Sequence, residues 1–351
     1  IPISTWLHKQ DLLENAFNAR FYEIKDRPAN NRIIDISILT KQLPTVIPWD
    51  DSFIANGDVL NIGEGYHGRV GMNLAKQPHA FIAGETGSGK SIILQCMIYQ
   101  ALKKNYKIFL IDFKRGVSFS GFSGFVDMVI ELEQAEKLLS DMIAEVKKRL
   151  DLFVAEGVQD IKGYNNKVSK EKRLQRIIVV VDELAELVDA GGADKEEKGL
   201  IQCINRNLRT LARIARAPGI HLLLGVQRPD SNIIDGQIKS NIPFRICGRF
   251  ADPQPSIIVL GNSKAAQLPS IPGRFIADNQ EIQAYYFTFQ PEQLASLCPV
   301  PYVNPEPSCS SAVEKDTTPL MEQHQENTDT EAKKHNKSSQ EGLDLDYSDF
   351  Q

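Results

Sequence analysis

Residues 84–91 read Gly-Glu-Thr-Gly-Ser-Gly-Lys-Ser, between the apolar run at 80–83 and the helix-like run at 92–99. This Gly-x-x-x-x-Gly-Lys-Ser pattern between a strand and a helix is typical of a phosphate-binding loop, because its glycines let backbone N–H groups surround a phosphate at the N-terminus of the helix. A glycine-rich turn without a ligand is the alternative, but here the motif is complete and stands in the required context. The sequence therefore predicts an ATP or GTP site.

The loop residues have distinct expected roles. Lys90 is expected to reach the β- and γ-phosphates of the nucleotide, and the hydroxyl of Ser91 is expected to hold Mg²⁺. The predicted nucleotide contacts are Gly84, Glu85, Thr86, Gly87, Ser88, Gly89, Lys90 and Ser91.

A second nucleotide signal is Ile177-Ile-Val-Val-Val-Asp-Glu183, an apolar strand that ends in two carboxylates. Ligands of open α/β sheets bind at the carboxyl ends of the strands. We expect Asp182 to hold Mg²⁺ through water and Glu183 to polarise the water that attacks the γ-phosphate. The alternative is that the pair only caps the next helix. A further strand, 107–112, intervenes along the chain, which favours an ATPase of the RecA-like type.

A third strand, 219–226, ends in the polar side chain of Gln227. An amide at this position could bind the γ-phosphate or the attacking water, and so report whether ATP is intact. The alternative is a turn-forming amide before Arg228 and Pro229, whose ring stiffens the turn.

The remaining pattern predicts an α/β fold, with a mostly parallel sheet covered by helices on both faces. Apolar residues at helical spacing between Ala135 and Leu150 predict a long amphipathic helix, and the alternation at 33–39 predicts a short strand. We divide the chain into a lead-in module at 1–56, an ATPase domain at 57–291 and an acidic tail at 292–351. The predicted strands of the sheet are 80–83, 107–112, 176–182, 221–226, 244–249 and 274–277.

Composition agrees with this division. The chain has 351 residues, 42% hydrophobic and 24% charged, as in ordinary globular proteins. Residues 301–351 carry 11 acidic and 4 basic side chains and few apolar ones, so we expect a disordered tail. Its last segment, 343–350, mixes acidic and apolar residues and is either a docking peptide or simply solvated. Five scattered cysteines indicate neither a disulfide framework nor a zinc site.

The motifs together resemble the successive signature blocks of the FtsK/SpoIIIE motor domain, in that family's order and spacing, from about residue 57 to 290. The blocks are Gln77–Ser91, Ile111–Arg115, Gly157–Asn165, Val181–Leu187, Ala215–His221, Val226–Pro229 and Ile238–Arg245. The resemblance implies a RecA-like ATPase that forms rings, usually hexamers, and pumps double-stranded DNA through a central pore. It gives Lys90, Ser91, Asp182, Glu183 and Gln227 the roles argued above.

A ring also implies that a neighbouring subunit supplies an arginine to each ATP. Arg245 is the first choice for this arginine and Arg216 the second, although either could simply form a local ion pair. DNA contacts are expected from basic residues on loops that face the pore, since these bind phosphates without reading sequence. The candidates are Lys114 and Arg115, Lys195 and Lys198 in the 191–199 loop, and Lys239.

The segment Phe113-Lys-Arg-Gly-Val-Ser-Phe119 resembles coupling translocases of conjugative elements, such as TcpA-like proteins, and also type VII secretion motors. The latter carry several ATPase domains, whereas one is found here, so the resemblance favours a coupling protein for a plasmid or integrative element. Chromosome partitioning is disfavoured because no winged-helix module follows residue 290. A protein-secretion ATPase stays open, while a non-catalytic scaffold is disfavoured because Lys90, Asp182 and Glu183 are all present.

This interpretation carries expectations about partners and location. The tail would dock relaxosome or transfer-channel proteins. The sequence contains no apolar run long enough to span a membrane and no signal peptide. Because the chain begins at Ile1, we expect a membrane anchor upstream and a place on the cytoplasmic side of a bacterial membrane.

Overall fold

A computed structural model describes residues 2–17, 20–27, 30–39, 42–114, 116–231, 233–234 and 236–288. The predicted tail at 292–351, its docking segment and Arg115 lie outside these residues, and the division of the chain at residues 56 and 291 stays a prediction. No helix among the described residues is long and apolar enough to cross a membrane.

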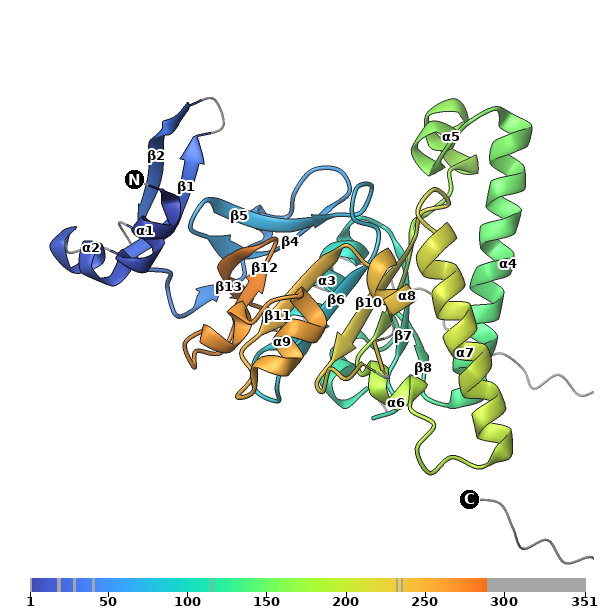
Figure 1. The fold of residues 1–351 in the computed structure, drawn as a ribbon. Helices are drawn as coiled ribbons and strands as arrows, with labels where there is room; N and C mark the ends of the chain where they lie inside the picture. The colour runs from blue at the N-terminus through green and yellow to red at the C-terminus, as the bar shows by residue number, and fades with distance from the viewer. Residues whose placement is uncertain are drawn as a thin grey trace, which may run out of the picture. The chain divides into compact units, whose positions relative to one another are not determined.

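The N-terminal residues form a small unit of two helices and a hairpin (Figure 1). Its elements are α1 (Ile3–His8), α2 (Gln10–Phe17), β1 (Arg20–Arg27) and β2 (Asn30–Leu39). The two strands pair antiparallel, and Arg27 forms an exposed ion pair of 2.6 Å with Asp35 across them. The alternation that predicted a strand at 33–39 thus marks the second half of β2.

The main sheet of the described residues has eleven strands, in the order β5-β4-β13-β12-β11-β6-β10-β9-β7-β8, with β3 paired to β13. The strands from β11 to β8 are all parallel to one another, and those from β12 to β5 form an antiparallel extension. The strands are β3 (Ile47–Pro48), β4 (Val59–Gly65), β5 (Gly68–Asn73), β6 (Ala80–Ala83), β7 (Lys107–Ile111), β8 (Asp127–Val129), β9 (Ile177–Val181), β10 (Ile220–Val226), β11 (Phe244–Gly248), β12 (Arg274–Ala277) and β13 (Gln280–Tyr286).

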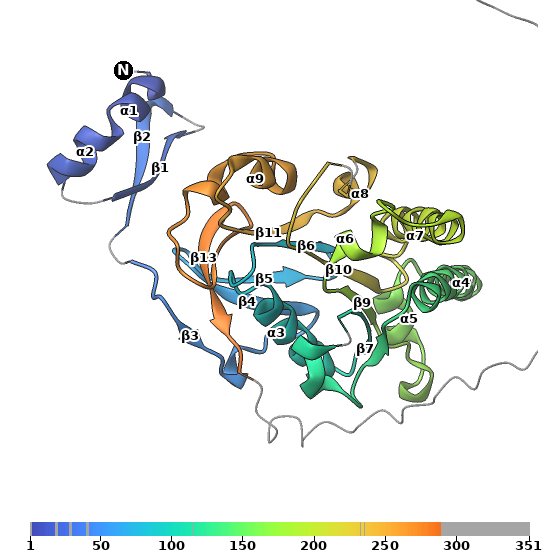
Figure 2. The same cartoon turned by 90° about the horizontal axis from the view of Figure 1, so that it is seen from below.

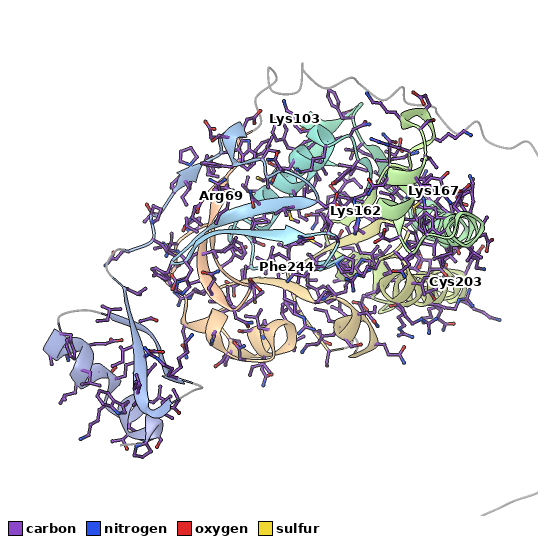
Figure 3. The ribbon with its side chains drawn as sticks, turned by 90° about the horizontal axis from the view of Figure 1, so that it is seen from above. Arg69, Lys103, Lys162, Lys167, Cys203 and Phe244 are labelled. Carbon is purple, nitrogen blue, oxygen red and sulfur yellow. The ribbon has the colours of Figure 1, made fainter. Side chains whose placement is uncertain are left out.

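Helices cover both faces of this sheet (Figure 2). One face packs on α3 (Lys90–Lys103), and the other on the long α4 (Leu132–Glu156) and on α7 (Lys195–Ile214). The strands are buried on both sides, which explains their continuous apolar runs. Phe244 of β11 belongs to the α3-side core (Figure 3). The other helices are α5 (Ile161–Lys167), α6 (Leu184–Val188), α8 (Gly236–Asn241) and α9 (Pro253–Leu260), with short 3-10 turns at 51–53, 117–122, 170–172 and 264–267.

The predicted α/β fold with a mostly parallel sheet flanked by helices is confirmed, and the six predicted strands and the long helix are all present. Strand β7 intervenes between β6 and β9 along the chain as predicted, and in the sheet it lies beyond β9, with β10 between β6 and β9. One detail differs from the prediction. The 191–199 segment is only partly a loop, because Asp194 caps α7 with a capping box to Glu197 and the helix begins at Lys195.

The segment before β4 is tied to the antiparallel extension of the sheet. The indole of Trp49 lies against the rings of Phe53, Tyr99, Tyr285 and Phe287, with centroids 5.5 to 6.2 Å apart, and its backbone N–H donates to the carbonyl of Tyr286 at 3.0 Å. Aromatic contacts of this kind contribute beyond their buried area. Residues upstream of the predicted boundary at 56 and 57 therefore contribute to the core of the ATPase sheet.

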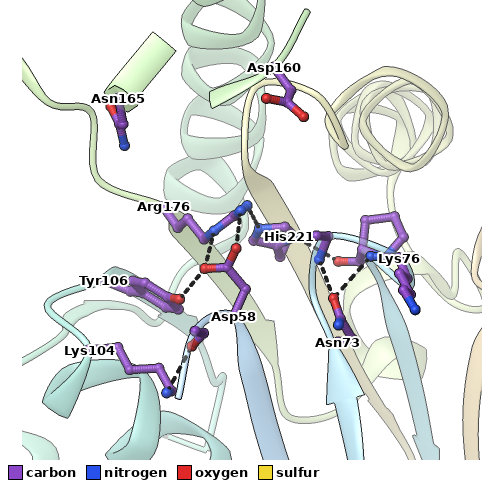
Figure 4. A network of polar contacts seen from close by, with 12 residues as sticks. Asp58, Asn73, Lys76, Lys104, Tyr106, Asp160, Asn165, Arg176 and His221 are labelled. Carbon is purple, nitrogen blue, oxygen red and sulfur yellow. Dashed lines mark hydrogen bonds and ion pairs between the residues drawn. The ribbon is translucent and has the colours of Figure 1, made fainter. Parts of the chain in front are cut away.

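A network of polar side chains lies at the edge of the sheet where the parallel strands begin (Figure 4). The guanidinium of Arg176 donates to both carboxylate oxygens of Asp58, at 2.9 and 2.6 Å, and to Nε2 of His221 at 3.1 Å. Nε2 is therefore an acceptor, so His221 carries its proton on Nδ1 and donates it to the carbonyl of Pro78 at 2.9 Å. Tyr106 adds a hydrogen bond of 2.8 Å to Asp58.

We expect Arg176→Met to lower the free energy of unfolding by about 3 kcal/mol, because it leaves the Asp58 carboxylate and a buried His221 acceptor without their partner. Burial alone would raise the pKa of Asp58, but the contacts of Arg176 and Tyr106 outweigh it and hold the pKa below its usual value. A depressed carboxyl pKa contributes stability above the unfolded-state pKa, and this contribution is lost as the pH falls through the folded-state pKa.

The measurement is urea unfolding of both proteins between about pH 7 and pH 3, where the difference between them should shrink below about pH 4. Arg173→Met is the matched control, since this nearby arginine is exposed and its loss should change stability by less than about 0.5 kcal/mol. A difference that stayed constant down to pH 3 would show that the Asp58 carboxylate is not its source.

Candidate functional site

The phosphate loop lies between β6 and α3, at the edge where the parallel strands end. Gly87 and Gly89 have φ angles of 83° and 102°, which disfavour any side chain. A Cβ on Gly84 would lie 2.3 Å from the hydroxyl oxygen of Ser88, so a larger residue there would require the Ser88 side chain to move. The loop is held by hydrogen bonds from Gly84 N–H to the carbonyl of Val226, at 3.1 Å, and from Gly273 N–H to the carbonyl of Ser88, at 2.8 Å.

Lys90, Ser91 and Asp182 meet at the start of α3. The ammonium of Lys90 donates to Oδ1 of Asp182 at 2.9 Å and to the carbonyl of Asp182, and the Ser91 hydroxyl lies 3.4 Å from the same Oδ1. Lys90 is 4% and Asp182 3% exposed. A hydroxyl beside a carboxylate is the oxygen donor set that Mg²⁺ takes from a protein when phosphates supply its other ligands. These residues therefore fit a magnesium-bound triphosphate.

Glu183 and Gln227 lie side by side because β9 and β10 are neighbours in the sheet. The backbone N–H of Gln227 donates to both carboxylate oxygens of Glu183, at 2.9 and 3.2 Å. Burial raises the pKa of Glu183, against the opposing effects of Lys90 and of these hydrogen bonds. Glu183 is also the N-cap of α6, where its side chain accepts a longer hydrogen bond of 3.4 Å from the N–H of Ala185, so the predicted capping alternative describes part of its surroundings.

Three further features of this edge were not foreseen. Asp112 directly follows β7 and is 4% exposed, and its pKa is raised by burial and by the nearby Asp182. The signal for it was a carboxylate at the end of an apolar strand, as for Asp182. Glu85 accepts a hydrogen bond of 2.9 Å from the N–H of Ala251, in the turn between β11 and α9, and Thr86 lies 3.5 Å from the amide oxygen of Gln227.

A cavity of about 580 Å³ opens beside the phosphate loop. It is within the usual size range of small-molecule sites. Its walls come from the loop, from the antiparallel extension and from the segment before β3. The lining residues are Thr45, Val46, Glu85, Thr86, Gly87, Gly89, Lys90, Ser91, Ile92, Ser118, Gln227, Ile271, Pro272, Gly273, Gln283, Ala284, Tyr285 and Tyr286.

The two candidate arginines lie away from the phosphate loop of their own chain. Arg245 is the second residue of β11, opposite Phe81 in the sheet, and it donates to the carbonyls of Lys239 and Ile242 at 2.6 and 3.1 Å. Burial lowers its pKa. Arg216 follows α7 at the edge where the parallel strands begin and donates to the carbonyl of Ala75 at 3.0 Å. Within the part of the chain that the structure describes, neither arginine forms a local ion pair, which was the alternative considered for both.

The candidate DNA-binding lysines are not gathered in one place. Lys114 forms an ion pair of 3.0 Å with Glu186 near the nucleotide edge. Lys195 and Lys198 are exposed in the first turn of α7. Lys239 lies on α8 and points to the carbonyl of Ile257 at 3.4 Å. Their role in DNA binding stays a prediction.

The chain is similar to known nucleotide-driven translocases. The profile of the FtsK/SpoIIIE family matches residues 63–231. The DNA translocase FtsK of Caldanaerobacter subterraneus subsp. tengcongensis is 36% identical over 218 residues, which are 60% of this chain and 29% of that protein. FtsK of Staphylococcus aureus is 33% identical over 237 residues, or 62% of this chain and 29% of that protein. The chain thus spans less than a third of the curated relatives that it matches.

Among solved structures, the pCW3 conjugation coupling protein TcpA, in a monomer form with ATPγS, is 41% identical with a TM-score of 0.72, and the match covers 84% of this chain and 86% of that one. The cytoplasmic domain of the type VII secretion ATPase EccC from Thermomonospora curvata is 23% identical with a TM-score of 0.55, covering 70% of this chain and 30% of that one. The second match supports the fold alone. The predicted resemblance is confirmed.

Proposed function

Since the chain belongs to the FtsK/SpoIIIE family and carries its ATPase domain, we propose that it is an ATP-driven translocase of double-stranded DNA. The relatives named DNA translocase FtsK support the DNA substrate. The observation that carries ATP hydrolysis is the meeting of Lys90, Ser91, Asp182 and Glu183 beside one cavity. The residues that line this cavity before β4 and after β11 lie outside the span matched by the family profile.

The chemistry follows from this arrangement. The loop N–H groups and Lys90 would bind the phosphates, while Ser91 and Asp182 would hold Mg²⁺, which supplies charge neutralisation at the β- and γ-phosphates. Glu183 would act as the base that takes a proton from the attacking water, and this role is supported by a carboxylate that the Gln227 N–H holds at the same edge as Lys90. Gln227 would orient that water or bind the γ-phosphate.

We further propose that the protein works as a ring, which would be a hexamer, with Arg245 reaching the ATP of the neighbouring subunit and Arg216 as the second choice. Arg245 lies on the face of the sheet opposite to α3, and Arg216 lies at the edge where the parallel strands begin, so both are turned away from the phosphate loop of their own chain. An arginine supplied across a heterologous interface fits this placement.

The cellular role that we propose is that of a coupling protein, which moves DNA of a plasmid or integrative element to a transfer channel at the cytoplasmic side of a bacterial membrane. It is supported by the likeness to the conjugation coupling protein TcpA over most of both chains. Relaxosome or channel proteins would then be the partners of the tail.

We expect double-stranded DNA to stimulate ATP hydrolysis, and the DNA concentration for half-maximal stimulation to rise at least about tenfold between about 50 and 200 mM salt, because each phosphate contact releases counterions. The measurement is phosphate release by purified protein with linear duplex DNA. Arg245→Ala should lower the stimulated rate at least about a hundredfold and leave ATP binding unchanged. A rate that does not respond to DNA, in protein shown to form rings, would contradict DNA translocation and favour a protein substrate.

A further inference from the structure

Part of the wall of the nucleotide cavity is built by chain segments that the family profile does not cover. Residues 45–46 and 271–273 and the end of β13 line it, and all of them lie outside the matched span of 63–231. Residues 45–46 and Tyr286 are more than 200 positions apart in the sequence. Segments that are distant in the sequence thus form one wall of the cavity, where they can contact the same ligand.

Residues 45 and 46 are held in place from both sides. On one side, the buried Arg274 donates to the carbonyls of Leu43 and Pro44 at 3.3 and 3.1 Å, while Glu281 and Gln283 fix its guanidinium. On the other side, Ile47 and Pro48 pair with the end of β13. The next residue, Trp49, packs against the rings of Tyr285 and Phe287. The fixed backbone therefore presents residues 45 and 46 to the cavity at low conformational cost.

Two apolar side chains are nevertheless left open to solvent at this place. Val46 is 56% and Tyr286 51% exposed, and both line the cavity that holds the phosphate loop. Strand alternation explains why Tyr286 differs from its buried neighbours Tyr285 and Phe287. An anchored backbone that displays a valine and a tyrosine toward an open cavity is suited to a flat, apolar ligand group.

We propose that Val46 and Tyr286 form the base subsite of the nucleotide, with the purine ring against the Tyr286 ring and the side chain of Val46. This inference rests on the proposed function, because it takes the triphosphate to lie in the phosphate loop. The two parts of the ligand would then occupy one continuous cavity, whose lining includes both Lys90 and Tyr286.

The lining also favours adenine over guanine. Guanine presents N–H donors on its Watson–Crick edge, which a carboxylate accepts well. Glu85 is the acidic residue among those that line the cavity, and its Oε1 already accepts the N–H of Ala251 at the phosphate end. The amide of Gln283 is likewise occupied by Arg274 and by the carbonyl of Pro272.

The test compares binding of ATP with binding of tripolyphosphate, which has the phosphates but no base. We expect Tyr286→Ala to weaken ATP binding about tenfold, since the loss of one aromatic platform under a base typically has this size, and Val46→Ser to weaken it about threefold. Tripolyphosphate affinity should not change in either variant. Val154→Ser is the matched control, because Val154 is an 81% exposed valine on α4, and it should leave both affinities unchanged.

Each other outcome would overturn the inference. Wild-type affinity for ATP in both cavity variants would show that the base lies elsewhere. An equal loss for ATP and tripolyphosphate would show that the substitutions disturb the phosphate loop and remove no base contact. Wild-type protein that binds tripolyphosphate as tightly as ATP would show that no base subsite exists. Failure of the wild-type protein to bind either compound would instead contradict the proposed function itself.

Discussion

Glu183→Gln should lower the rate of ATP hydrolysis at least about a hundredfold while ATP affinity stays within about threefold of wild type, because a general base contributes on the order of 10² to 10⁴ to the rate. The carboxylate is buried and is fixed by the N–H of Gln227 at 2.9 and 3.2 Å. Glutamine keeps an oxygen that can accept this hydrogen bond, so the geometry is retained while the capacity to take a proton from water is lost.

The measurement is DNA-stimulated phosphate release at saturating ATP, beside equilibrium binding of ATP to the same preparation. Glu133→Gln serves as the control, because Glu133 is an exposed carboxylate in the first turn of α4, far along the chain from the motifs, and its loss should leave the rate within about twofold of wild type. A Glu183→Gln protein that kept a tenth of the wild-type rate would assign the base to another group, with the buried Asp112 at the same edge of the sheet as one alternative carboxylate.

Gly225→Ala should remove most nucleotide binding although Gly225 belongs to none of the nucleotide motifs. A Cβ at this position of β10 would lie 2.1 Å from the carbonyl oxygen of Asp182 and 3.0 Å from the ammonium of Lys90. The backbone of β9 would have to move, and Lys90 and Asp182 would lose their positions. We expect ATP affinity to fall at least about tenfold and stability to fall by about 1 to 3 kcal/mol, as for an overpacked core.

ATP titration and thermal unfolding of the variant provide the measurement. Gly199→Ala is the matched control, because Gly199 lies within α7 with open space around it, and alanine there should raise stability by about 0.5 to 1 kcal/mol. Wild-type ATP affinity in Gly225→Ala would mean that β9 and β10 can separate without cost to the site, contrary to their continuous parallel pairing.

Much of the site could be predicted from the sequence because its signals are local. The phosphate loop and the 177–183 strand each carry their own motif, and the ends of parallel strands necessarily meet at one edge of a sheet. Lys90, Ser91, Asp182 and Glu183 are brought together for that reason. Their catalytic roles stay predictions.

The sequence of α7 carries a helix signal that the predicted loop at 191–199 did not take into account. Its apolar residues Ile201, Ile204, Leu208 and Leu211 recur at helical spacing, and Asp194 with Glu197 forms a capping box. The many charged residues and Gly199 favoured a loop at 191–199. Burial of the apolar stripe against α4 outweighs the glycine, and the helix begins at Lys195.

Apart from β12, the antiparallel extension could not be predicted in the same way. Its strands β4 and β5 contain Gly63, Gly65, Gly68 and Gly71, which weaken the strand pattern. The pairing of β4 with β13 joins residues more than 200 positions apart. The wall of the nucleotide cavity formed by β13 and the segment before β3 depends on such long-range pairing, and so no local signal pointed to Val46 or Tyr286.

The hydrogen bond between Glu85 and Ala251 connects the phosphate loop to the strand that carries Arg245. At one end, the turn that follows this strand is attached to the phosphate loop by the 2.9 Å contact. At the other end, the same strand carries Arg245. An extended strand in the middle of a sheet is nearly inextensible, since its backbone already rises about 3.3 Å per residue. We therefore expect a shift of the loop to be transmitted along β11 to Arg245 and to the carbonyls of Lys239 and Ile242 that this side chain contacts.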